Sequence, residues 1–162
     1  MTSLNLKIAA LGALALSVPA FAPAVAQESN VYVNGGYTAF DGDGGADLGA
    51  ITGRAGVGFG QYFAVEGEAS FGVKDDGGLD LDNELGLFGV GVLPINERVN
   101  LFARAGWARI ETSPGGDEDG AAYGVGANFF FTDHDGIRLD ATRHDYDAGN
   151  VDAYSVSYVR RF

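Results

Sequence analysis

The chain has 162 residues, 46% of them hydrophobic, with 26 glycines and no cysteine. So much hydrophobic sequence argues against an intrinsically disordered chain, and the lack of cysteine excludes a disulfide framework, a thiol nucleophile and a cysteine-ligated metal. The formal net charge of −12 argues against nucleic acid as a partner, because that affinity comes from Lys and Arg that neutralise phosphate.

The segment 1–26 has the features of a secretory signal peptide. Lys7 precedes the apolar run Ile8–Val18, and Ala24–Ala26 gives a small-x-small cleavage site. The apolar run is too short for a membrane-spanning helix, which needs about 20 residues. We therefore expect cleavage after residue 26 and a single mature domain over 27–162.

Beyond Gln27, hydrophobic residues alternate with small or polar ones at period two, which is typical of half-buried strands. Glycine is dense enough to disfavour helices by about 1 kcal/mol per position. One run, Glu84–Leu93, is apolar on both faces, so its register stays open. The eight predicted strands are Val31–Ala39, Ile51–Phe59, Phe63–Val73, Glu84–Leu93, Val99–Trp107, Ala121–Phe131, Ile137–His144 and Val151–Phe162.

The connections between these strands alternate between short and long. The short ones lie near 61–62, 94–98 and 132–135, and the longer, Gly/Asp-rich ones cover 41–48, 74–83, 111–120 and 145–150. Such alternation is typical of an up-and-down barrel. The sequence therefore predicts an all-β fold, an eight-stranded antiparallel up-and-down transmembrane β-barrel.

The choice between a soluble and a membrane barrel depends on which face is apolar. A soluble barrel, such as a ligand carrier, keeps its apolar residues inside, whereas a membrane barrel turns them outward. The second face of these strands is rich in glycine and carries equal numbers of positive and negative side chains. Because buried charges persist only when paired, we expect a charge network that fills the lumen. Its predicted members are Arg54, Glu66, Glu68, Arg104, Arg138 and Asp140.

Aromatic residues on the apolar face favour the membrane barrel. They fall into two rows, one near the short turns and one near the long loops, as in the aromatic girdles of membrane barrels. The alternative is the ordinary preference of aromatic residues for strands. The rows are Phe59, Phe63, Phe129, Phe131 and Phe162 near the turns, and Tyr37, Phe71, Trp107, Tyr123 and Tyr154 near the loops.

The whole of 27–162 resembles the small outer-membrane β-barrel (porin-like) family, the OmpA/OmpX type of eight-stranded barrel. The resemblance rests on the Ala-x-Ala-like signal site at 24–26 and on three stretches of the mature chain: 31–37, 101–107 and 154–162. It implies export through the periplasm to the outer membrane, with both termini in the periplasm. It also implies contacts with outer-membrane lipids and lipopolysaccharide, and no peptidoglycan-binding domain is expected because no residue follows Phe162.

The final strand is similar to the signal that the family's assembly machinery recognises. The signal residues implied by the resemblance are Tyr154, Val156, Tyr158 and Phe162. Arg160 departs from the apolar or aromatic residue usual at its position, and near the membrane edge its long side chain can reach water.

An enzymatic role is the least favoured alternative. The stretch 143–150 is similar to the motif of a related barrel class that deacylates lipid A with His and Ser, but Tyr146 stands where the nucleophilic serine would be. Without an activated hydroxyl, acyl transfer has no attacking group. His144 is therefore predicted to be a rim or lumen residue, and no catalytic residue is assigned.

No cofactor or metal site is assigned from the sequence. The loop segments 41–45 and 75–78 offer oxygen ligands for Ca²⁺ without following a known calcium-loop pattern, so weak divalent binding shared with lipopolysaccharide phosphates is only a hypothesis. We expect a structural or surface-interaction protein with acidic outward loops and an extracellular ligand that the sequence does not identify. A small-solute pore is the alternative.

Overall fold

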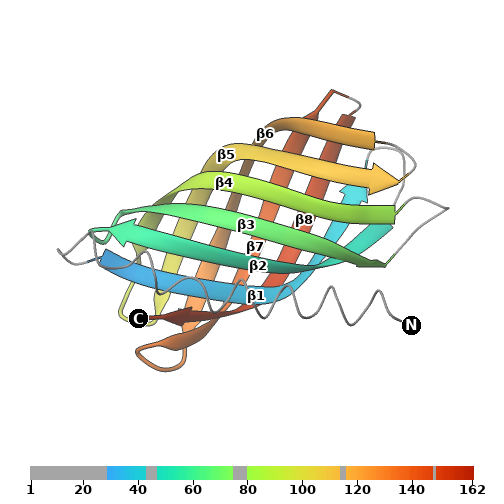
Figure 1. Ribbon diagram of the computed structural model, residues 1–162. Coiled ribbons are helices and arrows are strands. Elements are labelled where there is room, and N and C mark those ends of the chain that lie inside the picture. Colours follow the sequence, from blue (N-terminus) through green and yellow to red (C-terminus); the bar gives the residue numbers. More distant parts are fainter. Residues whose placement is uncertain (1–28, 43–46, 75–79, 114–115, 148) are drawn as a thin grey trace.

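The computed structural model describes residues 29–42, 47–74, 80–113, 116–147 and 149–162. Its eight strands close into one barrel in which each strand pairs antiparallel with the next and the last pairs with the first (Figure 1). This arrangement confirms the predicted fold class. The strands are β1 (Ser29–Gly42), β2 (Asp47–Phe59), β3 (Phe63–Lys74), β4 (Asp80–Pro94), β5 (Val99–Ser113), β6 (Gly116–Phe130), β7 (Asp135–Tyr146) and β8 (Gly149–Arg161).

The two ends of the barrel differ. One end, here called the turn end, holds the three connections after β2, β4 and β6 together with the start of β1 and the end of β8. The opposite end, here called the loop end, holds the connections after β1, β3, β5 and β7. The predicted signal peptide and parts of all four predicted long loops lie outside the described residues, at 43–46, 75–79, 114–115 and 148.

Two of the predicted long loops are largely strand, which corrects the sequence prediction. Pairing of β5 with β6 continues out to Thr112 opposite Gly116, and pairing of β7 with β8 continues to Tyr146 opposite Gly149. Alternation of apolar and polar residues is lost in the β5–β6 extension because its outward face is charged, as at Asp117 and Asp119, yet the backbone ladder does not require an apolar face. Cross-strand contacts such as Arg109 with Asp117, at 2.6 Å, join these extensions.

The structure settles the open register of β4. Leu85, Leu87 and Leu93 point outward and are more than half exposed, whereas Glu84 and Phe88 point inward and are buried. The strand is apolar on both faces because Phe88 belongs to an apolar cluster inside the barrel. The inward face of β4 therefore combines packed apolar side chains with the buried carboxylate of Glu84.

The outer wall carries the large apolar side chains. Trp107 is 56% exposed and Val125 is 64% exposed, and both predicted aromatic rows lie on this wall. The first row lies beside the turn end, whereas the second lies about midway along the strands, as Trp107 and Tyr123 show. In water such a surface would be an extensive apolar patch, whereas against lipid it is the expected wall of a membrane barrel. No helix in the described residues is long and apolar enough to cross a membrane.

Inward glycines admit large side chains into the narrow interior. A Cβ atom on Gly56 would overlap the Tyr32 ring, and one on Gly126 would overlap the Phe102 ring. At the loop end the interior is closed by a buried cluster, here called the apolar cap, whose members are Phe40, Leu48, Ala50, Ile110, Tyr146 and Ala153. Rings and apolar side chains thus fill parts of the lumen in which charged groups are absent.

Candidate functional site

The six charged residues predicted to face the lumen all lie inside the barrel. They come from β2, β3, β5 and β7, and none is more than 8% exposed. They are Arg54, Glu66, Glu68, Arg104, Arg138 and Asp140. We call this set the lumen charge belt.

Glu66 is the most enclosed carboxylate of the belt. Its Oε1 accepts a hydrogen bond from Arg104 Nη1 at 2.9 Å, and its Oε2 accepts one from Arg138 Nη1 at 2.7 Å. The Tyr32 hydroxyl donates to the same Oε2 at 2.8 Å. Glu66 is 0% exposed, so protein donors replace the water that a carboxylate requires.

The other two carboxylates complete a ring of alternating charge. Glu68 accepts hydrogen bonds from Arg54 and from Arg104, the latter at 2.8 Å. Asp140 pairs with Arg54 at 3.1 Å and with Arg138 at 3.3 Å. Each arginine therefore lies between two acids and each acid between two arginines, and six ion pairs close the ring.

Aromatic and hydroxyl groups pack on the belt from neighbouring layers. The Arg104 guanidinium lies 4.0 Å from the centroid of the Phe88 ring, and that of Arg138 lies 4.1 Å from the centroid of Phe102. Such stacking stabilises a desolvated cation. Buried hydroxyls form a hydrogen-bonded row of their own, whose members are Ser70, Thr52, Thr38 and Ser155.

The structure adds a buried pair that the sequence prediction missed. Glu84 on β4 is 0% exposed, and its Oε1 lies 2.9 Å from His144 Nε2 on β7. Glu84 was missed because its strand is apolar on both faces. The exposed Leu85, Leu87 and Leu93 all stand at odd-numbered positions of the strand. If these large side chains had been assigned to the outward face, Glu84 would have been predicted to point inward.

His144 lies away from the surface at which a lipid substrate would be found. It is 1% exposed inside the lumen, and its ring stacks on Tyr146 with 5.7 Å between the ring centroids. Lipid A lies outside a barrel, in the membrane. The geometry therefore gives no support to deacylation at His144.

The residues of the predicted assembly signal point outward from β8. Tyr154, Val156 and Tyr158 are about half exposed, and Phe162 is 65% exposed. Arg160 also points outward, where its Nη1 donates to Asp135 at 2.9 Å. This pairing explains how an arginine is accommodated at the turn end.

A cavity of about 810 Å³ opens at the turn end of the barrel. Asn30, Asn100 and Asn128 contribute amides to its wall, and it is also lined by Tyr32 and Arg138. These last two residues contact Glu66, so the cavity reaches the belt. The interior is therefore open for part of its length from the turn end.

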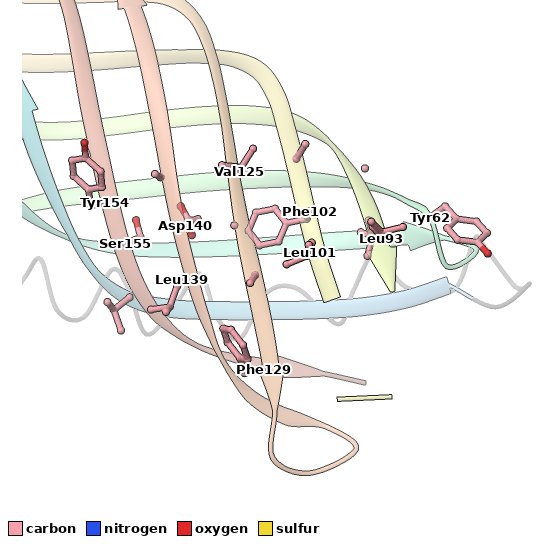
Figure 2. Close-up of a pocket in the computed structure, with 17 residues that line it drawn as sticks. Tyr62, Leu93, Leu101, Phe102, Val125, Phe129, Leu139, Asp140, Tyr154 and Ser155 are labelled. Carbon is pink, nitrogen blue, oxygen red and sulfur yellow. The ribbon is translucent and has the colours of Figure 1, made fainter. Parts of the chain in front are cut away.

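A second hollow, of about 920 Å³, lies on the outer wall over β4 to β8 (Figure 2). Leu93, Leu101, Val125 and Leu139 are among the exposed side chains that line it. Small residues between them, such as Ala103, leave a shallow apolar groove. Its chemistry suits hydrocarbon chains.

A family model described as "Outer membrane protein beta-barrel domain" matches residues 8–162. A search of curated proteins gives no significant sequence match. The family match thus spans every strand of the barrel.

Solved structures share the fold at low sequence identity. The crystal structure of Ail, the attachment invasion locus protein of Yersinia pestis, in complex with the heparin analogue sucrose octasulfate is 18% identical, covers 84% of this chain and 100% of Ail, and has a TM-score of 0.61. OprG from Pseudomonas aeruginosa is 12% identical over 83% of this chain and 96% of its own, with a TM-score of 0.66. Neisserial surface protein A is 15% identical over 84% of this chain and 98% of its own, with a TM-score of 0.59. These identities support a common fold alone.

Proposed function

The chain belongs to the family of the outer membrane protein beta-barrel domain, and on this basis we propose that it is a structural or surface-interaction protein whose closed lumen does not conduct solutes. The outer membrane is its location. The observation that carries the proposal is the ring of six buried ion pairs across the lumen.

The lumen contents support a closed barrel over a diffusion pore. An eight-stranded barrel has an interior just wide enough for side chains, and here the charge belt fills one level of it. The apolar cap fills a second level at the loop end. A solute entering the cavity at the turn end meets the charge belt at Arg138, and the apolar cap lies beyond it.

The outer wall supports contacts with membrane lipids and lipopolysaccharide. Its apolar band would lie against acyl chains, and its aromatic rows would lie at the two interfaces. We place the loop end outside the cell and both termini in the periplasm. In this orientation the groove over β4 to β8 is filled by lipid hydrocarbon.

Charge at the loop end supports a cationic partner. Most of the acidic residues fall in the four predicted loops, and the described cations Arg109 and Arg143 are each paired there with an aspartate. Ail is described with a heparin analogue, which is a polyanion. A polyanion would be repelled by the acidic loop end of this chain. We therefore propose that the loop end binds a cationic partner.

We expect the purified barrel in nanodiscs to bind a cationic peptide and not heparin, with binding that weakens as salt rises because exposed charges are screened. Replacing Asp41 and Asp147 at the loop end by Asn should weaken peptide binding. The matched control replaces Glu97 by Gln and Asp133 by Asn at the turn end, with no expected effect. Surface plasmon resonance measures peptide binding by the two double variants. An equal loss of peptide affinity in both would contradict a partner site at the loop end.

Two further proposals concern export and assembly. We infer that 1–26 are removed on export, because the segment combines a short apolar run with the Ala24–Ala26 site. We also assign Tyr154, Val156, Tyr158 and Phe162 as the signal read by the outer-membrane assembly machinery. Their outward alternation on the last strand supports this assignment.

A further inference from the structure

Three ionisable side chains meet between the belt and the apolar cap. Glu68 on β3, Glu84 on β4 and His144 on β7 each bring one carboxylate oxygen or ring nitrogen within 4.8 Å of the others, and all three are buried. We propose that this cluster is a binding site for one divalent transition-metal ion of the Zn²⁺ class. The site lies inside the barrel and is independent of any surface partner.

Unpaired buried polar atoms at this place support a metal ligand set. Glu84 Oε2, His144 Nδ1 and Tyr146 Oη have no hydrogen-bond partner among the residues that the structure describes. Glu84 and His144 are at most 1% exposed. Buried polar atoms are nearly always paired, and leaving one unpaired costs free energy. The three atoms belong to residues in contact, because Glu84 is hydrogen-bonded to His144 and Tyr146 stacks on the His144 ring. Together they indicate a ligand that interacts with several of these groups at once.

The charges of the lumen require a cation at the same place. The buried belt pairs Arg54, Arg104 and Arg138 with three carboxylates, and Glu84 adds a fourth carboxylate. A buried carboxylate without a positive partner is strongly unfavourable. The cation that balances Glu84 is either a proton, on His144 or on Glu84 itself, or a metal ion held by the cluster.

The unpaired atoms decide between these two cations. A proton on His144 strengthens the contact from Nε2 to Glu84 Oε1, which already exists at 2.9 Å, and leaves Glu84 Oε2, His144 Nδ1 and Tyr146 Oη as they were. A metal ion takes several ligands at once, and a water bound to it offers a hydrogen-bond partner to the Tyr146 hydroxyl. The metal therefore accounts for the unpaired Glu84 Oε2 and, through its bound water, for the Tyr146 hydroxyl, which the proton on His144 leaves unexplained.

The ligand types select the class of metal. An imidazole nitrogen with two carboxylates suits Zn²⁺ and its neighbours in the transition series. Ca²⁺ requires six to eight oxygen ligands, which this cluster with one histidine does not provide. Because β7 is distant in the sequence from the consecutive strands β3 and β4, His144 meets the two carboxylates only in the closed barrel.

The test measures metal retained by the folded barrel. The protein is refolded in detergent with Zn²⁺, passed through a desalting column and analysed by inductively coupled plasma mass spectrometry. We expect one Zn²⁺ per chain, and loss of that ion in Glu84→Gln and in His144→Gln. The matched control is His134→Gln, which removes an exposed histidine in a turn and should retain the ion.

A spectroscopic measurement separates loss of the site from loss of the fold. Co²⁺ in place of Zn²⁺ should give visible absorption bands that His144→Gln abolishes and His134→Gln preserves, with the folded state of each variant verified by its gel mobility before and after boiling. Excess Ca²⁺ should not displace the bands. Folded wild type that retains no Zn²⁺, or folded His144→Gln that retains as much as the wild type, would overturn the proposal.

Discussion

Replacing Glu66 by Gln should lower the free energy of unfolding by about 3–5 kcal/mol, the usual cost of removing one partner from a buried ion pair. Glu66 accepts hydrogen bonds from Arg104, Arg138 and Tyr32 and is 0% exposed. The neutral amide leaves two buried arginines with one anionic partner fewer. Urea titration of the barrel in detergent micelles, followed by tryptophan fluorescence from Trp107, measures the change.

The control for this experiment is Glu97→Gln. This substitution makes the same chemical change at an exposed turn position. Exposed ion pairs contribute only about 0–1 kcal/mol to the free energy of unfolding. We expect its unfolding midpoint to match that of the wild type. Equal stability of Glu66→Gln and Glu97→Gln would contradict the assignment of Glu66 to a desolvated ion-pair ring.

Replacing Val125 by Arg should destabilise the membrane-inserted barrel by about 2–4 kcal/mol, the cost of a cation on the lipid face near the bilayer midplane. Val125 is 64% exposed on β6, between Tyr123 of one aromatic row and Phe129 of the other. The arginine would replace hydrocarbon contact with a charge that lipid cannot solvate. Folding titrations in phospholipid vesicles measure the loss.

Two companion variants separate charge from shape in that measurement. Val125→Ala removes the side chain without adding charge, and Gln61→Arg adds the charge at an exposed turn. Both should fold nearly as well as the wild type. If Val125→Arg folded as stably as Gln61→Arg, the outer wall would not face lipid.

The architecture was predictable because one physical rule governs each strand. A barrel wall has two faces in different surroundings, so side chains must alternate, and Phe63–Lys74 shows this with outward Phe63 and Val65 against inward Glu66 and Glu68. The same rule predicts the six belt positions. It fails for β4, where Phe88 and other apolar side chains inside the barrel remove the contrast between the faces.

The order of residues around the charge ring was not predictable from alternation. Arg54 contacts Glu68 on the neighbouring strand but also Asp140, which is 86 residues further along the chain. Such a contact crosses the lumen and depends on barrel closure and on side-chain rotamers. The Glu84 and His144 pair, from β4 and β7, depends on the same closure.

Polar strand ends were also beyond the reach of the sequence pattern. At the loop end, the outward faces of β5 and β6 carry charged residues where apolar ones stand elsewhere, as Arg109, Asp117 and Asp119 illustrate. Gly and Asp in such segments usually indicate loops. Backbone pairing extends the strands there because each ladder bond satisfies a donor and an acceptor whatever the side chain.

Single-channel recording tests the central claim that side chains close the lumen of this outer-membrane barrel. The purified wild-type protein is folded, verified by its shift in gel mobility on boiling, and added to a planar lipid bilayer beside a known porin as a positive control. We predict no discrete, reproducible openings, because the charge belt and the apolar cap fill successive levels of the interior. Openings of uniform size that recur with each insertion event would contradict the closed lumen and favour a small-solute pore.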